Sequence, residues 1–381
     1  MRITQLSTPA ALVDQAKMAH NLLRMQSRMN ALQVRFRPHV KTTKCLPIVQ
    51  AQIAAGAQGI TVSTLKEAEQ FFAAGVQDIL YAVGIAPSKL AQAAALQHLG
   101  CNLKLIVDSL AGATALTAYG QAHQVQFSVL LEIDTDGHRS GIKPEAQALI
   151  DIGRHLHQTG SHLQGVMTHA GASYELNSSQ ALAAMAEQER ALCVRAAERL
   201  RAAGLPCPIV SIGSTPTALS AANLVGVTEV RAGVYIFFDL VMANVGVCGL
   251  EDIALSVLTT VIGHQEEKGW ILVDAGWMAM SRDRGTQKQD IDYGYGQVCD
   301  ADGVLIEGLT MTSANQEHGI LSQSVTHSGR QDSENLTQRF PVGTLLRILP
   351  NHACATGAQF PDYQALGEQG LMKTWPRFYG W

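Results

Sequence analysis

Short runs of β-branched and other apolar residues alternate with longer amphipathic stretches over residues 10–240. This alternation is typical of strands that are joined by helices and that pair in parallel. We interpret eight runs as strands, at residues 34–40, 58–62, 78–83, 103–107, 126–133, 163–168, 208–212 and 227–231. Eight strand and helix units in succession predict a (β/α)8 barrel of the TIM type, with a doubly wound α/β sheet as the competing architecture.

Two of the intervening helices have ends that can be read from the sequence. In "TLKE", Thr64 and Glu67 have the spacing of a capping box, and Gly75 is placed to end that helix. The amphipathic stretch that begins at Ser179 keeps its helical period as far as Gly204. These ends place helices where the barrel requires them.

The pattern changes after Val247. Alternating runs such as "ALSVLTTVIG" and "GWILVDAGW" are separated by glycine and charged turns, and a helical period returns only in the last 20 residues. This predicts a second, β-rich domain with which the first ten residues pair. We therefore expect a barrel over residues 11–246 and a β-rich domain made of residues 1–10 and 247–381.

Composition and charge narrow the class of protein. The 381 residues carry a formal net charge of −4, and 47% are hydrophobic. This balance argues against nucleic acid or an anionic membrane as a partner, and no run reaches the roughly 18 apolar residues of a membrane span. Seven scattered cysteines without a CxxC pair predict reduced thiols. We expect a cytoplasmic protein.

Polar and glycine-rich residues follow the predicted strands. Lys41 follows the first strand, and later strands are followed by residues 134–141, 169–174, 213–217 and 232–237. In a parallel barrel these positions meet at one rim, where the chemistry of such folds collects. Their shared placement predicts a site on that rim.

The segment "RFRPHVKTTKC", residues 35–45, places several cations in one run. A lysine that acts as an amine near neutral pH needs burial or cationic neighbours to lower its pKa, so we expect Lys41 to be buried at the strand end. Arg37, His39 and Lys44 would set the local potential or help to bind anions. For Arg35 and Arg37, simple alternation in and out of a barrel strand is the better explanation.

Two strand ends have the composition of a phosphate site. Glycine lets backbone N–H groups approach an anion and hydroxyls donate hydrogen bonds, although a plain turn between strand and helix has the same composition. The residues concerned are Gly213, Ser214, Thr215, Gly233 and Tyr235. A phosphate site with a strand-end lysine indicates pyridoxal 5′-phosphate (PLP), which requires both. A solvated or salt-bridged Lys41 is the alternative.

A candidate metal site lies in "LPNHACAT", residues 349–356. His352 and Cys354 are two residues apart, so in an extended segment both side chains point to one face. Imidazole and thiolate suit Zn²⁺ or a related divalent ion, and two protein ligands leave positions for water or substrate. A pair of structural residues, buried without a metal, is the alternative.

The motifs "RPHVKTTK", "THAGASY", "RAGVYIFFD", "VDAG", "EHG" and "LPNHACAT" together resemble those of the D-serine dehydratase and D-threonine aldolase family. Its members are alanine racemase-like (fold-type III) PLP enzymes that pair a barrel with a β-domain and use a divalent metal. The motifs occur in family order from residue 8 to residue 356. The resemblance implies an alanine racemase-like fold and a homodimer.

The same resemblance implies roles for individual residues. Lys41 forms the Schiff base with PLP and is the catalytic base, and His352 and Cys354 hold the metal, which is Zn, Mn, Co or Mg. The remaining members of the expected cofactor site are Arg139 near the phenolic oxygen, His169 against the pyridine ring, Arg231 where the racemases place a partner for the pyridine nitrogen, and Tyr174 of the "THAGASY" motif.

Two departures within the motifs bear on the substrate. Cysteine at the second metal position is the pattern of the dehydratases, whereas the aldolases tend to carry aspartate there. The common "KTHK" reads "KTTK" here, with Thr43 in place of histidine, which indicates a different substrate side chain. The resemblance thus implies a dehydratase of a 3-hydroxy D-amino acid, with D-threo-3-hydroxyaspartate as the expected substrate and oxaloacetate and ammonia as products. D-serine dehydratase, D-threonine aldolase and a PLP-binding homeostasis protein are the alternatives, and the second domain counts against the last.

Overall fold

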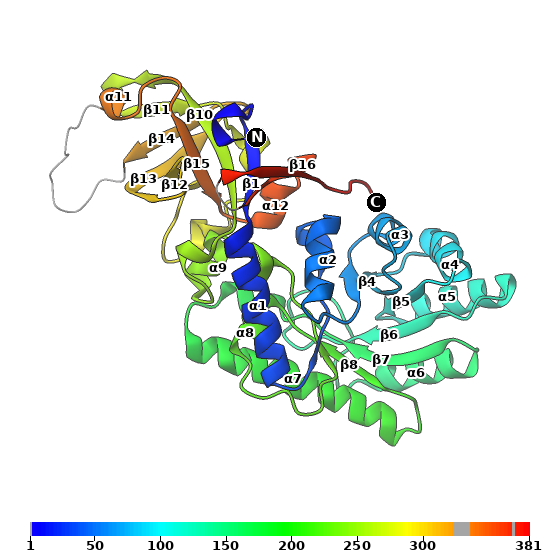
Figure 1. The fold of residues 1–381 in the computed structure, drawn as a ribbon. Coiled ribbons are helices and arrows are strands. Elements are labelled where there is room, and N and C mark those ends of the chain that lie inside the picture. The colour runs from blue at the N-terminus through cyan, green and yellow to red at the C-terminus, as the bar shows by residue number, and fades with distance from the viewer. Residues whose placement is uncertain (1, 324–335, 368–369) are drawn as a thin grey trace. The chain divides into compact units, whose positions relative to one another are not determined.

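The structure, a computed structural model, describes residues 2–323, 336–367 and 370–381 (Figure 1). The chain divides into two compact units. The barrel unit comprises residues 23–233 and 378–381, and the β-rich unit comprises residues 1–22 and 234–377. These limits differ from the expected ones, because more of the N-terminal segment and residues 234–246 group with the β-rich unit.

Eight parallel strands form the sheet of the barrel unit, in the order β2-β9-β8-β7-β6-β5-β4-β3. They are β2 (Arg35–Phe36), β3 (Ile60–Val62), β4 (Asp78–Gly84), β5 (Asn102–Val107), β6 (Ser128–Glu132), β7 (His162–Met167), β8 (Ile209–Ile212) and β9 (Glu229–Val230). A parallel bridge between His39 and Thr61 joins the two ends of this order, so the sheet closes into a ring. Each strand falls within or beside a predicted run. The barrel is confirmed, and the doubly wound sheet is wrong.

Helices follow the strands and lie outside the ring, as Figure 1 shows for α3 to α7 around β4 to β8. They are α2 (Leu46–Ala54), α3 (Leu65–Ala73), α4 (Leu90–His98), α5 (Leu110–His123), α6 (Gln147–Gln158), α7 (Ser179–Ala202) and α8 (Thr215–Ser220), while α1 (Gln15–Ala31) precedes β2 and is divided between the two units. The predicted ends are confirmed. Thr64 caps α3 by accepting the N–H of Glu67, and Gly75 and Gly204 follow α3 and α7 with positive φ angles of 96° and 76°.

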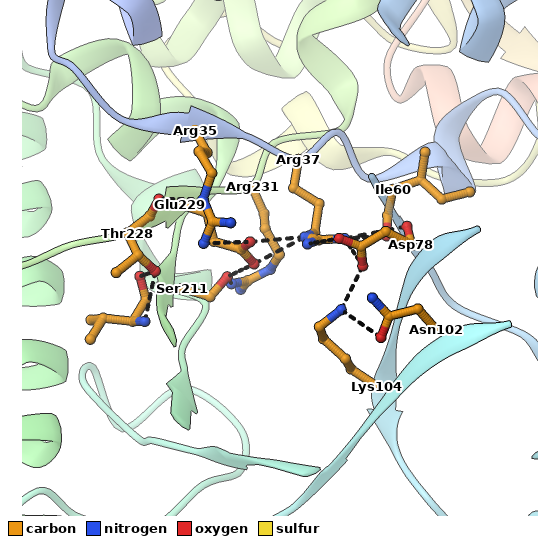
Figure 2. A network of polar contacts seen from close by, with 11 residues as sticks. Arg35, Arg37, Ile60, Asp78, Asn102, Lys104, Ser211, Thr228, Glu229 and Arg231 are labelled. Carbon is orange, nitrogen blue, oxygen red and sulfur yellow. Dashed lines mark hydrogen bonds and ion pairs between the residues drawn. The ribbon is translucent and has the colours of Figure 1, made fainter. Parts of the chain in front are cut away.

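The interior of the barrel is divided between apolar and charged side chains. A cluster of buried apolar residues comprises Leu80, Ile106, Leu130, Met167 and Ile209. Ser211 is the strand partner of both Met167 and Glu229, and partners in neighbouring strands share a face. Arg37 and Glu229 are each 2% exposed and form an ion pair with Nε and Oε2 3.0 Å apart. The interior is therefore partly a polar network (Figure 2).

The β-rich unit contains a nine-stranded, mainly antiparallel sheet, in the order β11-β14-β13-β12-β15-β10-β1-β16-β17. Its strands are β1 (Ala10–Asp14), β10 (Leu255–Gln265), β11 (Trp270–Val273), β12 (Gly296–Asp300), β13 (Leu305–Ala314), β14 (Gly319–Gln323), β15 (Leu345–Pro350), β16 (Asp362–Leu366) and β17 (Met372–Pro376). Short helices accompany them: α9 (Leu240–Val245), α10 (Trp277–Met280), α11 (Leu336–Arg339) and α12 (Ala353–Gly357).

Two details of this unit correct the sequence analysis. Strand β1 pairs with β10 and β16, so residues 11–14, which we assigned to the barrel, run in the sheet of the β-rich unit. The helical period expected in the last 20 residues is wrong, because β16 and β17 pair there as antiparallel strands. Tyr363 and Ala365 are fully buried in β16, so burial in the sheet decides the local structure. Over the described part of the chain, no helix is long and apolar enough to cross a membrane.

Candidate active site

Lys41 lies at the rim where the strands of the barrel end. Strand β2 is followed by the bridge at His39 and then by a 3-10 turn, η2 (Val40–Thr42), which carries Lys41 at its centre. Val40 and Thr42 are buried, whereas Lys41 is exposed. The expectation that Lys41 is buried is wrong, because the turn directs its two neighbours into the protein and leaves the lysine at the surface.

His169 follows β7 and is held as a neutral ring. Its Nδ1 donates to the carbonyl oxygen of Gly213 at 3.0 Å, which leaves Nε2 as the nitrogen with a free lone pair. Burial is the main reason that the pKa of His169 falls to about 4, and the hydrogen bond to Gly213 opposes that fall. The positive charges of Lys41, Arg231 and Arg139 lower the pKa further. Lys41, Arg139 and His169, which the strand-end rule placed on one rim, are therefore close enough for their charges to interact.

His39 belongs to the same group of residues. Burial lowers its pKa well below the ordinary value, and the charges of Lys41 and Arg231 act in the same direction. Its Nε2 is 3.5 Å from the hydroxyl oxygen of Ser63. Two neutral imidazoles thus lie among the cations at the rim of the barrel.

Arg231 directly follows β9 and is 3% exposed. Its Nη1 donates to the hydroxyl oxygen of Ser211, and its Nη2 donates to the carbonyl oxygen of Thr168, each at 2.5 Å. Burial lowers the pKa of Arg231, while the charge of Glu229 raises it. An arginine keeps its proton even in such surroundings, so it is a fixed positive charge beside His169.

The turn after β8 explains the glycine and the hydroxyl residues predicted there. Gly213 has a φ angle of 128°, and a Cβ atom on it would lie 2.2 Å from the carbonyl oxygen of Arg231, so only glycine fits. Ser214 caps α8 by accepting the N–H of Thr217, and Thr215 is the buried first residue of that helix. A plain turn accounts for these contacts, and the phosphate-binding role of the three residues stays a prediction.

The other predicted cofactor residues lie in different surroundings. Gly233 is packed against η2, since a Cβ atom there would be 2.9 Å from the carbonyl oxygen of His39. The ring of Tyr174 is 6.1 Å from that of His169, between centroids. Arg139 is exposed, with its Nη2 3.6 Å from the carboxylate of Glu132. Tyr235 is buried and belongs to the β-rich unit, whereas the others belong to the barrel unit.

Glu189 is a residue of this site that the sequence analysis missed. It is 1% exposed on α7, and its Oε1 accepts the N–H groups of Ala170 at 2.9 Å and of Gly213 at 3.1 Å. Burial raises its pKa. A signal was present in the sequence: Glu189 continues the apolar stripe of the helix that contains Leu182, Ala186 and Cys193. An acidic residue in such a stripe indicates a buried hydrogen-bonding role.

In the β-rich unit, His352 and Cys354 lie at the start of α12. His352 is the residue before the helix and Cys354 is in its first turn, so the extended segment that we expected for the pair is wrong. The two side chains are nonetheless neighbours. Burial alone would lower the pKa of His352, but the Cys354 thiol and the Asp283 carboxylate outweigh it and raise the pKa well above the ordinary value.

Two acidic residues that the sequence analysis missed support this pair. The Nδ1 of His352 is 2.6 Å from Oδ2 of Asp283, and this hydrogen bond is the main reason that the pKa of Asp283 is lowered. The carboxylate of Asp239 caps α9 and also accepts the N–H of Ala353 at 2.9 Å, so it fixes the start of α12. Among the described residues, no group of three or more His, Cys, Asp or Glu side chains has the arrangement of a metal site.

Comparison with known proteins defines the class. Residues 13–241 match the family model of the alanine racemase N-terminal domain, and residues 254–366 match that of the putative serine dehydratase domain. The chain therefore belongs to the alanine racemase-like family, in the branch that carries the serine dehydratase domain. This confirms the family and the fold class that the motifs implied.

Individual relatives narrow the comparison. The chain is 63% identical over 377 residues to D-threo-3-hydroxyaspartate dehydratase of Delftia sp. strain HT23, which covers 99% of this chain and 98% of that one. It is 33% identical to D-serine dehydratase of Dictyostelium discoideum, over 96% of this chain and 94% of the relative. A structure of the Delftia enzyme covers 100% of both chains with a TM-score of 0.97 and 62% identity. D-threonine aldolase of Filomicrobium marinum, at 24% identity and a TM-score of 0.83 over 99% and 96% of the chains, shares the fold.

Proposed function

We propose that this protein is a PLP- and divalent metal-dependent dehydratase, a lyase that converts D-threo-3-hydroxyaspartate to oxaloacetate and ammonia. The observation that carries the proposal is the 63% identity to an enzyme named for this reaction, over almost the whole of both chains. The cluster of Lys41, His169 and Arg231 at the rim of the barrel supports it from the side of the chemistry.

The residues at the rim fit PLP. An exposed amine on Lys41 is accessible to an aldehyde, and the cations of Arg139 and Arg231 suit a phosphorylated, phenolate-bearing ring. When bound, the cofactor supplies an electron sink that makes the Cα–H bond of an amino acid acidic.

The chain's own groups divide the remaining tasks. The Nζ atom of Lys41 holds the cofactor and then takes the proton from Cα. His169 accepts hydrogen bonds at Nε2 because Gly213 occupies its Nδ1 proton. Arg231 keeps a fixed positive charge and donates no proton, because guanidinium is not deprotonated in proteins.

His352 and Cys354 fit a divalent ion. A ligating histidine usually donates its second ring N–H to a carboxylate, and the contact between Nδ1 of His352 and Asp283 leaves Nε2 for an ion. Cys354 and the Asp283 carboxylate raise the pKa of His352 and so favour positive charge at this position, which an ion would supply in place of the proton. When bound, the ion would act as a Lewis acid that assists loss of the β-hydroxyl group.

The test compares substrates on one preparation loaded with PLP and metal. We expect D-threo-3-hydroxyaspartate to give ammonia and a 2-oxo acid faster than D-serine does, and D-threonine to give little glycine and aldehyde. Faster turnover of D-serine would favour the second candidate, D-serine dehydratase, for which the 33% identical relative speaks. Glycine as the main product from any of these substrates would indicate an aldolase.

We also propose a homodimer, as the family resemblance implies, and a location in the cytoplasm, which the scattered cysteines without a CxxC pair favour. Sedimentation equilibrium of the PLP-loaded protein should give twice the chain mass of 40.8 kDa. A fully active species at the single-chain mass would contradict the dimer and leave the proposed reaction standing.

A further inference from the structure

A chain of buried hydrogen bonds leads from the interior of the barrel to Arg231 (Figure 2). Nη1 of Arg231 donates to Oγ of Ser211 at 2.5 Å, and Oγ of Ser211 donates to Oε1 of Glu229 at 2.7 Å. Nε of Arg37 lies 3.0 Å from both carboxylate oxygens of Glu229. All four side chains are at most 3% exposed, so water does not compete for these contacts.

The direction of each hydrogen bond in this chain is fixed by chemistry. Arginine can only donate, and the Glu229 carboxylate, held by Arg37, can only accept. Ser211 has one hydroxyl proton, and that proton must point to Glu229, so a lone pair of its oxygen must face Arg231. The hydroxyl therefore has a single orientation, and an alanine at this position would leave Nη1 of Arg231 without this acceptor.

The second guanidinium nitrogen of Arg231, Nη2, contacts the peptide group between Thr168 and His169. Nη2 donates to the carbonyl oxygen of Thr168, and the hydroxyl of Thr168 donates to the carbonyl oxygen of Ile133 at 2.7 Å. His169 comes next in the chain, with its ring held by Gly213. Arg231 thus joins the end of β9 to the end of β7, and Ser211 of β8, the strand between them, supports it from within.

We infer that Ser211 and Glu229 are positioning residues of the candidate active site, which fix Arg231 and, through the Thr168 carbonyl, the peptide of His169. They act without contact to the cofactor or substrate. The inference rests on the proposed function, since Arg231 and His169 are expected beside PLP. Their role is to hold the cation in one orientation before the cofactor arrives, so that binding does not have to order it.

The far half of the network offers a matched control. Arg37 also donates to both carboxylate oxygens of Asp78 at 3.0 Å, and Nζ of Lys104 is 2.6 Å from Oδ1 of Asp78. Lys104 is 7% exposed, and its Nζ hydrogen-bonds Asp78 and Asn102. Lys104→Met removes a partly buried ion pair while it leaves Arg37 to hold Asp78. If the network only stabilised the barrel, Lys104→Met and Ser211→Ala would both lower the melting temperature and would have the same effect on PLP affinity.

The experiment measures PLP affinity of the apoprotein by absorbance titration, together with the melting temperature of the apoprotein and kcat and KM of the loaded enzyme. For Ser211→Ala we expect about a tenfold weaker PLP affinity, the scale of one lost hydrogen bond to a charged group, and a lower kcat at similar KM. For Lys104→Met we expect a lower melting temperature with an unchanged PLP affinity. Ser211→Thr keeps the hydroxyl and should restore most of the affinity.

A double-mutant cycle tests whether Ser211 acts through Arg231. Arg231→Lys keeps the charge but loses the fork of donors, so Ser211→Ala should weaken PLP binding much less in that background than in the wild type. Additive effects would overturn the inference, as would equal PLP affinity of Ser211→Ala and the wild type. Failure of the wild type to bind PLP would instead overturn the proposed function, and the inference with it.

Discussion

At the scale of single residues, Lys41 carries the proposed chemistry. We predict that Lys41→Ala abolishes the visible absorbance of the PLP-loaded protein and lowers turnover by on the order of 10³-fold or more, because linkage and proton transfer are both lost. Lys44 is a suitable control, since its Nζ forms an ion pair with the buried Glu67, at 3.1 Å from Oε1. Lys44→Met should keep the absorbance. A borohydride-reducible adduct that persists in Lys41→Ala would contradict the assignment.

His169 makes a prediction about pH. Its pKa is lowered to about 4 in the folded protein, mainly by burial, against an ordinary value of 6.5. Between these two values the unfolded chain binds a proton that the folded chain does not, so His169 lowers stability as pH falls through that window and has no such effect above it. Urea unfolding of the apoprotein should therefore lose less stability between pH 7 and pH 5 in His169→Gln than in the wild type. Identical losses would show that His169 is not the group involved; His39 is expected to account for part of the remainder.

The sequence predicted these residues to different extents. Lys41 and His169 were placed together because strand ends of a barrel converge, and that rule needs no side-chain detail, whereas Arg231 was assigned from the family resemblance. The exposure of Lys41 depends on a 3-10 turn that the strand-like run "RFRPHV" does not indicate. Glu189 acts on backbone N–H groups of other segments, and such contacts leave no spacing in the sequence.

At the scale of elements, α7 is tied to the ends of β7 and β8 by one carboxylate. We predict that Glu189→Ala lowers the free energy of unfolding by about 2–4 kcal/mol, because the N–H groups of Ala170 and Gly213 lose their buried acceptor. Glu187 is a matched control on the same helix: its side chain is 51% exposed and pairs with Arg190. Glu187→Ala should change stability by no more than about 0.5 kcal/mol. Urea unfolding measures the stability of both variants. Equal losses in Glu189→Ala and Glu187→Ala would show that the Glu189 carboxylate does not hold the ends of β7 and β8 to α7.

The elements themselves were predictable where local signals decide them. The eight barrel strands and the caps of α3 and α7 follow from period and capping residues. The order of the nine-stranded sheet does not, because β1 pairs with β10 and β16, which lie more than two hundred residues further along the chain. Pairing at that separation is decided by burial in the assembled sheet. Burial in the sheet also explains why the last residues form β16 and β17 and not the expected helix.

At the scale of the whole molecule, the predicted cofactor residues other than Tyr235 and the proposed metal ligands belong to separate units of the chain. Lys41, His169 and Arg231 are in the barrel unit, whereas His352 and Cys354 are in the β-rich unit. No residue belongs both to the predicted cofactor site and to the proposed metal site. Loss of the metal should therefore leave PLP bound, and loss of PLP should leave the metal bound. The cofactor proposal and the metal proposal can thus be tested independently.

The last prediction uses that separation. Removal of the metal by a chelator should abolish release of ammonia from D-threo-3-hydroxyaspartate while the visible absorbance of bound PLP persists, because the cofactor acts at Cα and the ion only at the leaving hydroxyl group. Cys354→Ser removes the proposed thiolate ligand and should lower the metal content that remains after dialysis. Cys248→Ser is the control, since Cys248 is half-buried like Cys354 and is not a proposed metal ligand. Cys354→Asp exchanges a soft ligand for a hard one and should shift preference from Zn²⁺ toward Mn²⁺ or Mg²⁺. Full activity in the metal-free protein, or equal metal content in the two serine variants, would remove His352 and Cys354 from the proposed mechanism.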